Sequence, residues 1–149
     1  MIFRTAQIED IPQIQTVRNS VFENRLSDPG LVTDEACAEF ITARGKGWVC
    51  EFKRELVGFS IVDMKESNVW ALFVKPDFEH KGIGKHLHKL MLNWYFKQTQ
   101  HTLWLNTAPN TRAIAFYKKA GWNEVGMHGS SEIKFEMNFN SWLINQSNI

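Results

Sequence analysis

The sequence has few cysteines and no long hydrophobic run, and each absence excludes a class of protein. Its 149 residues include only two cysteines, Cys37 and Cys50, without CxxC spacing or a histidine placed as a zinc partner. We therefore expect reduced, partly buried thiols and no metal site. No apolar segment approaches the roughly 18 residues of a membrane-spanning helix. Residues 1–4 lack the apolar core of a signal peptide, which predicts a cytoplasmic protein.

Strong net charge is also missing. The formal charge is +1, whereas domains that hold nucleic acid by bulk electrostatics are usually strongly basic, so we expect no nucleic-acid partner. A composition of 44% hydrophobic and 22% charged residues is typical of globular proteins, and the length predicts a single domain over residues 1–149.

Hydrophobic periodicity predicts seven strands and four helices. The expected strands are 2–6, 48–52, 56–63, 68–74, 102–107, 122–125 and 133–139. The expected helices are capped by Asp10, begin near Thr33, run from Gly82 to about Gln98, and are capped by Asn110. Residues 69–74 are all apolar, which indicates a central strand covered on both faces. The fold class is therefore α/β, with a mixed sheet of about seven strands flanked by about four helices.

The segment 74–85 joins this central strand to the longest helix. The backbone N–H groups at a helix N-terminus have no intrahelical partner and carry partial positive charge. Gly82 and Gly84 let an anion approach the main chain, and Lys81 and Lys85 add charge. The segment therefore predicts a phosphate cradle. A dinucleotide fingerprint fails because position 87 is leucine, and a P-loop fails at Glu79 and His86.

A second segment, residues 110–122, carries another motif. It reads N-x-x-A-x-x-F-Y-x-K-x-G-W, and the first segment reads V-x-P-x-x-x-x-x-G-x-G. Together they resemble the acetyl-CoA-dependent N-acetyltransferase superfamily, the GNAT fold, and the order of predicted elements matches that fold. The resemblance implies an enzyme that moves an acetyl group from acetyl-CoA, as co-substrate, to a primary amine.

The resemblance also implies where coenzyme A lies. The parallel strands 68–74 and 102–107 would splay apart, with the pantetheine arm between them bonded to the backbone of Phe73 and Val74. The pyrophosphate would meet the N–H groups of six consecutive residues, which are His80, Lys81, Gly82, Ile83, Gly84 and Lys85. Asn106 would lie near the pantetheine, and Asn110 would contact the cofactor where the last helix begins.

Tyr117 is the candidate acid, and the resemblance also implies that it contacts coenzyme A. The resemblance implies that it protonates the departing thiolate, and a phenol with a reference pKa near 10 stays protonated at neutral pH. The amine would attack the thioester directly in a ternary complex, with the strand backbone polarising the carbonyl group.

The base is not fixed by the sequence. Asn68 stands near where several family members carry a catalytic glutamate, so Glu66, Glu23 or a water relay remain the candidates. Glu79 also departs from the usual glutamine or arginine, and we expect its side chain to point to solvent. These departures favour, as an alternative, a CoA-binding sensor or scaffold without turnover.

The acceptor would approach from the first two helices and the loop at 24–32. A small amine, a peptide or a protein N-terminus all remain open, and a peptide or protein acetyltransferase is a further alternative. His86 and His88 face different ways on a helix, so we expect solvated or phosphate-facing roles for them. By analogy with the fold, the chain is a possible homodimer, with Trp142 and Leu143 as candidate interface residues.

The small net charge hides an uneven distribution. Residues 75–119 carry a net charge of +6, and residues 1–40 carry −4. The basic block coincides with the two expected coenzyme A motifs. The acidic block coincides with the expected acceptor side, which suits a cationic amine.

Overall fold

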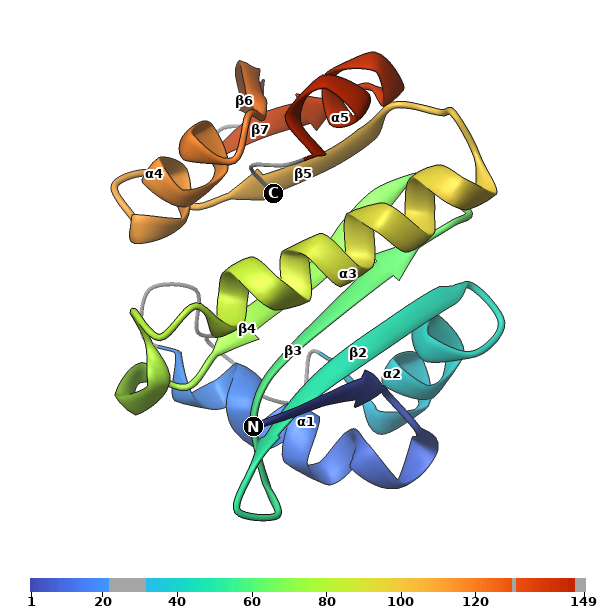
Figure 1. The fold of residues 1–149 in the computed structure, drawn as a ribbon, viewed down its shortest axis with the longest axis vertical. Helices are drawn as coiled ribbons and strands as arrows, with labels where there is room; N and C mark the ends of the chain where they lie inside the picture. The colour runs from blue at the N-terminus through green and yellow to red at the C-terminus, as the bar shows by residue number, and fades with distance from the viewer. Residues whose placement is uncertain (22–31, 130, 147–149) are drawn as a thin grey trace.

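A seven-stranded mixed sheet forms the centre of the computed structural model, which describes residues 1–21, 32–129 and 131–146 (Figure 1). The strands are β1 (Ile2–Thr5), β2 (Gly45–Phe52), β3 (Glu55–Asp63), β4 (Asn68–Val74), β5 (Leu103–Thr107), β6 (Asn123–His128) and β7 (Glu132–Met137). They lie in the order β1-β2-β3-β4-β5-β7-β6. Only the β4–β5 pair among these described strands is parallel.

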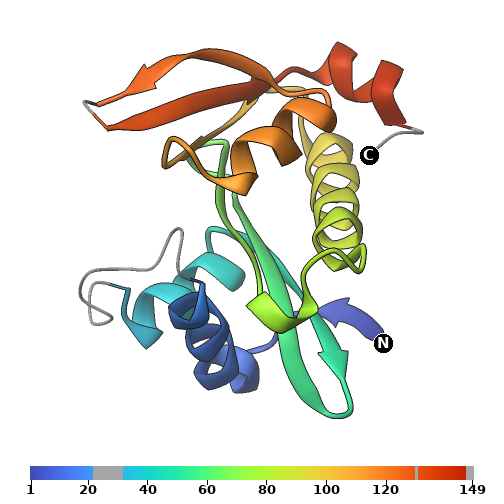
Figure 2. The ribbon, with the colours of Figure 1, turned by 90° about the vertical axis from the view of Figure 1, so that its left-hand side faces the viewer.

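Helices cover both faces of the sheet. They are α1 (Ile11–Ser20), α2 (Asp34–Ile41), α3 (Ile83–Gln98), α4 (Arg112–Lys119) and α5 (Phe139–Asn145), with short 3₁₀ turns at Ile8–Asp10 and Pro76–Phe78. Figure 2 shows α1 and α2 on one side of β2–β4 and α3 on the other. Two hydrophobic clusters fill these layers, and β4 contributes Val69 to one and Ala71 to the other. The predicted central strand with two covered faces is therefore confirmed.

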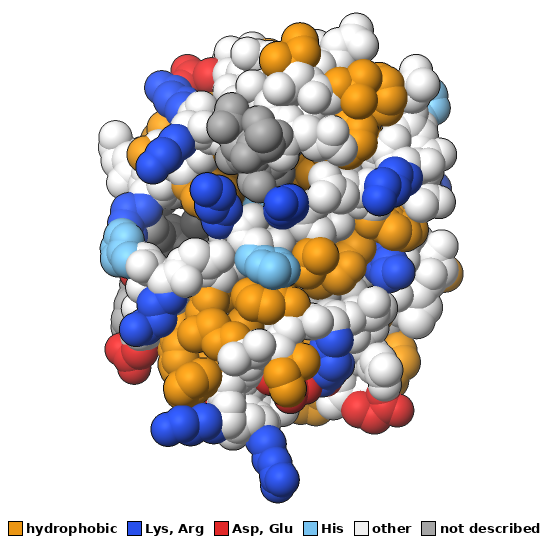
Figure 3. Space-filling view, viewed as in Figure 1, with side chains coloured by type: hydrophobic (Ala, Val, Ile, Leu, Met, Phe, Trp, Pro, Cys, Tyr) orange, Lys and Arg blue, Asp and Glu red, His pale blue; other side chains and the backbone are white. Residues whose placement is uncertain are grey.

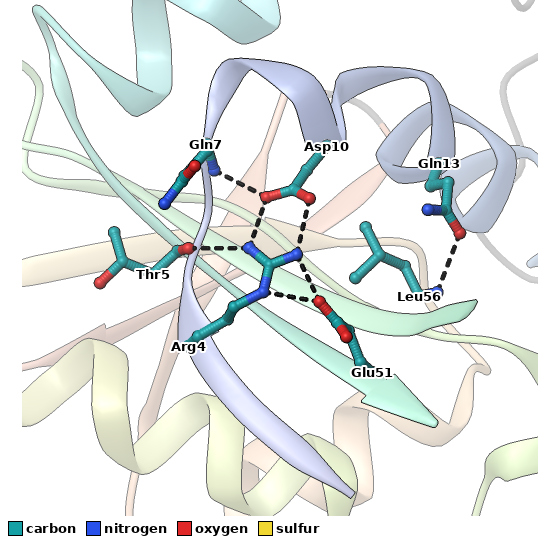
Figure 4. Close-up of polar contacts among 7 residues, drawn as sticks. All are labelled: Arg4, Thr5, Gln7, Asp10, Gln13, Glu51 and Leu56. Carbon is teal, nitrogen blue, oxygen red and sulfur yellow. Dashed lines mark hydrogen bonds and ion pairs between the residues drawn. The ribbon is translucent and has the colours of Figure 1, made fainter. Parts of the chain in front are cut away.

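An arginine ties β1 to the start of α1 and to β2 (Figure 4). Arg4 donates to both carboxylate oxygens of Asp10, each at 2.8 Å, and its Nε donates to Glu51 at 2.6 Å. Asp10 occupies the predicted N-cap position of α1, but its side chain makes no capping hydrogen bond, because it bonds Arg4 and the backbone N–H of Gln7 at 2.7 Å. The hydrogen bonds from Arg4 hold the pKa of the Asp10 carboxyl below its usual range.

The C-terminal region differs from the sequence prediction. The strand expected to reach residue 139 ends at Met137, and α5 follows as a fifth helix. Asn138 caps α5 by accepting a hydrogen bond from the N–H of Ser141 at 2.8 Å. Trp142 is buried against α3 and donates to Asn93 at 3.2 Å, so this candidate interface residue packs within its own chain. The homodimer stays a prediction.

Two further observations concern the helices. Thr111, not Asn110, occupies the N-cap position of α4, and Asn110 has a left-handed backbone with φ of 61°. Of the helices that the structure describes, none is both long enough and apolar enough to cross a membrane.

Arg18 is an unusual member of the core between α1 and the sheet. It is only 6% exposed, and its Nε and Nη2 atoms have no hydrogen-bond partner among the described residues. Its guanidinium carbon lies 4.9 Å from the ring centre of Trp70 and 5.2 Å from that of Phe73. These ring faces offset part of the cost of removing the charge from water. The same burial lowers the pKa of Arg18.

We expect Arg18→Met to raise the free energy of unfolding by about 1–3 kcal/mol, because burying an unpaired charge costs more than aromatic contacts return. Denaturant unfolding at neutral pH measures the change. Arg18→Lys is the control, since it keeps the charge without the planar group and is expected to destabilise the chain. A loss of stability in Arg18→Met would show that the ring contacts outweigh desolvation.

Candidate functional site

The site begins where β4 and β5 separate. Their register contains one pair, Asn68 with Trp104, and the Asn68 side chain donates to the carbonyl oxygen of Trp104 at 3.2 Å. Nearby, Ala71 pairs with Ile61 and Val69 with Val62, so Trp70 is an extra residue that bulges from β4. The predicted splay of the two strands is confirmed.

A cavity of about 270 Å³ lies between the separated strands. Its lining comes from β4, β5, α4 and β7, and includes Phe73, Asn106 and Tyr117 among the predicted site residues. Because β4 does not pair with β5 beyond the first residue, its edge offers backbone N–H and C=O groups to a ligand. A slot with a polar backbone edge and apolar walls fits an extended chain with amide groups.

The N-terminus of α3 has an open backbone. Gly82 has φ of +81°, and a Cβ atom built on it meets nothing within 4 Å. A Cβ on Gly84 would lie 3.7 Å from Val74 Cγ2 and 3.9 Å from Phe116 Cε1, facing the gap between α3 and α4. Lys81 and Lys85 are exposed beside these glycines. A helix N-terminus with two glycines and two exposed lysines fits a phosphate-bearing group.

The other cradle residues take different positions. His80 is exposed with φ of 62°, whereas the Ile83 side chain is buried in the core. Val74 is half-buried beside Gly84.

Lys and Arg side chains are spread over the face that carries α3, and few Asp or Glu side chains appear there (Figure 3).

Glu79 does not point to solvent as predicted. Its carboxylate binds Arg112 at the start of α4, with Nη2 to Oε1 at 2.7 Å and Nη1 to Oε2 at 2.5 Å. Arg112 Nη1 also lies 3.4 Å from Nε2 of His80. The ion pair joins the two motif segments and neutralises the carboxylate beside the cradle, which removes much of its repulsion toward a phosphate.

Tyr117 extends from α4 into the cavity wall. It is 6% exposed and packs against the rings of Trp122 and Phe135 at 5.6 and 6.0 Å. Burial raises the pKa of its phenol, so the hydroxyl keeps its proton at neutral pH. A protonated phenol at the cavity is able to donate a proton to a leaving group.

Glu66, one of the candidate bases, is not brought to the cavity. Glu66 is exposed in the turn before β4, outside the cavity lining, and its backbone carbonyl accepts from Trp104 Nε1 at 3.0 Å. Glu23 and most of the loop at 24–32 lie outside the described residues. Asn110 is exposed and lies outside the lining.

Sequence reasoning missed Glu132. This half-buried residue of β7 lines the cavity, and its carboxylate accepts a hydrogen bond from the Asn106 amide. The two residues are 26 positions apart and meet because β7 pairs with β5. The predicted closing hairpin was the available signal, but it did not specify that β7 adds to β5.

The two helix histidines separate as their spacing predicts, but only one is solvated. His86 is exposed and stacks on Phe3 with ring centres 3.8 Å apart. His88 is buried, and its Nε2 accepts a hydrogen bond from Trp122 Nε1 at 2.9 Å. The solvated or phosphate-facing role expected for His88 is therefore wrong. Burial lowers the pKa of His88 to about 3.

Comparison with known proteins identifies the fold and the family. Residues 11–122 match the Acetyltransferase (GNAT) family, and the chain belongs to that family. The resemblance inferred from the two motifs is confirmed.

Individual relatives are more distant. The chain is 33% identical over 73 residues to the ribosomal protein bS18-alanine N-acetyltransferase of Escherichia coli K12, a match that covers 47% of this chain and 49% of that protein. The chain therefore spans about half the length of the curated relatives it matches.

Solved structures agree in fold. The PaiA N-acetyltransferase of Thermoplasma acidophilum, crystallised with coenzyme A, has a TM-score of 0.80 at 18% identity, covering 92% of this chain and 98% of that one. The E. coli ribosomal-protein-S18-alanine N-acetyltransferase has a TM-score of 0.74 at 17% identity, covering 93% of both chains.

The buried His88 predicts an acid-sensitive fold. Its pKa falls from 6.5 in the unfolded chain to about 3 in the folded one, so the unfolded state binds more protons between these values. The contribution of neutral His88 to the free energy of unfolding is fully present above pH 6.5. It is lost as pH falls toward 3, by about 1.4 kcal/mol per pH unit. His88→Gln keeps an acceptor for Trp122 but does not titrate. Denaturant unfolding at pH 7, 6, 5 and 4 is expected to show a shallower decline for this variant, and equal slopes would contradict the assignment.

Proposed function

We propose that this chain transfers the acetyl group of acetyl-CoA to a primary amine by direct attack in a ternary complex. The observation that carries this proposal is the cavity between β4 and β5, which has a protonated tyrosine in its wall. The open N-terminus of α3 supplies a second feature that suits the pyrophosphate. Acetyl-CoA supplies the activated acyl group as a thioester.

The chain's own residues would hold coenzyme A in two places. The pantetheine arm lies in the splay, against the backbone of Phe73 and Val74 and beside Asn106. The pyrophosphate meets the amide groups from His80 to Lys85, with Asn110 contacting the cofactor at the start of α4. The backbone of β4 polarises the thioester carbonyl.

Tyr117 completes the transfer. As the amine nitrogen forms its bond to the carbonyl carbon, the carbon–sulfur bond breaks and the Tyr117 hydroxyl gives its proton to sulfur. The second proton of the nitrogen restores the phenol. The raised pKa of Tyr117 keeps this proton in place until the thiolate leaves.

The acceptor we propose is the N-terminal amine of a protein or peptide. The support is the similarity to enzymes named for N-acetylation of an alanine of ribosomal protein bS18. A direct test mixes the purified chain with acetyl-CoA and an alanine-initiated peptide and measures thiol release. The same peptide with a blocked N-terminus is the control. Tight acetyl-CoA binding without thiol release from any peptide or small amine would instead support a sensor.

We expect Gly84→Ala to weaken coenzyme A binding at least about tenfold, because the added methyl occupies the backbone surface that the pyrophosphate approaches. The free chain accommodates this methyl at ordinary contact distances, so its stability stays equal or rises by less than about 1 kcal/mol. Calorimetric titration and thermal unfolding measure the two effects. Gln98→Ala, at the far end of α3, is the control. Unchanged affinity in Gly84→Ala would refute the cradle assignment.

Tyr117→Phe is expected to lower turnover at least about tenfold while acetyl-CoA affinity stays within a few-fold, because only the proton donor is removed. Tyr95→Phe is a matched control, since Tyr95 is a buried tyrosine of α3 whose hydroxyl donates to the His101 carbonyl at 3.2 Å. Steady-state thiol release reports turnover. Equal rates for Tyr117→Phe and the native chain would remove Tyr117 from the mechanism.

A further inference from the structure

The carboxylic acid of the cavity is Glu132. Of the described residues that line the cavity, it is the one with an acidic side chain. It comes from β7, whereas Tyr117 comes from α4, so a candidate base and a candidate acid reach one cavity from different elements. Glu66 lies outside the lining, and Asn68, which does line the cavity, carries an amide and not a carboxylate.

The surroundings of Glu132 leave its carboxylate available. Asn106 donates its amide N–H to Glu132 and so holds the carboxylate in one orientation while leaving other lone pairs for a ligand. On the same face of β7, Lys134 and Glu136 face one another at 3.8 Å. His128 is the register partner of Glu132 on β6.

We propose that Glu132 binds the ammonium group of the acceptor and accepts its proton before acetyl transfer. This inference rests on the proposed function and deepens it. An amine arrives protonated near neutral pH, because its pKa is about 8 for an N-terminus and above 10 for lysine. A carboxylate attracts this cation and accepts a proton, which the neutral amide of Asn106 does not do.

The proton balance is complete. The ammonium gives one proton to Glu132, and the free nitrogen attacks the thioester carbon. The carbon–nitrogen bond forms, the carbon–sulfur bond breaks, and Tyr117 protonates the sulfur. The second nitrogen proton returns to Tyr117, and Glu132 releases its proton to solvent. The products are an N-acetyl amine, coenzyme A thiol and one proton.

The test compares Glu132→Gln with Glu136→Gln. Glutamine retains the size of glutamate and an oxygen that accepts the Asn106 bond, so both variants are expected to keep the native unfolding temperature. At pH 7, kcat/KM for an alanine-initiated peptide is expected to fall at least about 100-fold in Glu132→Gln and to change less than about threefold in the control. The loss of kcat/KM in Glu132→Gln is expected to shrink as the pH rises toward the pKa of the amine, where the peptide arrives deprotonated. Near-native kcat/KM in Glu132→Gln, or a deficit that stays constant with pH, would overturn the assignment.

A binding measurement separates this inference from the proposed function. The peptide with a free N-terminal amine and the same peptide with an acetylated N-terminus are titrated into the chain saturated with coenzyme A. The native chain is expected to prefer the free amine at least about tenfold, and Glu132→Gln is expected to lose that preference. Preference without turnover would refute the proposed reaction and retain Glu132 as the amine-binding group. An equal preference in both proteins would refute the role of Glu132.

Discussion

The site depends on the early end of the ladder between β4 and β5. One register pair, Asn68 with Trp104, joins the only parallel strands of the described sheet. Beyond that pair, β4 and β5 do not pair through their backbones, and a ligand or water must satisfy the exposed N–H and C=O groups. The cavity lies in this separation, and the bulge at Trp70, which bends β4, falls beside it.

Other contacts keep the two halves of the sheet together. The larger hydrophobic cluster joins α3 to β2 and β3 on one half and to β5 and β7 on the other. Within it, the hydrogen bond from Trp122 to His88 links the residue before β6 to α3. The α3 helix therefore replaces the missing ladder as the connection between the halves. It also presents its N-terminus where the strands open.

The sequence predicts those parts of the structure that depend on local patterns. Gly82 and Gly84 mark the start of α3, and the apolar run at 69–74 identifies the central strand. The helix after Asn138 is missed because Trp142 and Leu143 are interpreted as part of a C-terminal tail. The burial of His88 and the position of Glu132 depend on packing between distant elements. Local spacing specifies how side chains diverge along one element, but not what covers them.

The ion pair between Glu79 and Arg112 changes how the basic face interacts with an anion. Residues 75–119 carry a net charge of +6, yet Arg112 already has a carboxylate partner within the protein. A phosphate that reaches Arg112 exchanges one anion for another, so fewer mobile counterions are released into solution than the basic residues suggest. Binding at this face is consequently less sensitive to ionic strength than its eight basic residues alone imply.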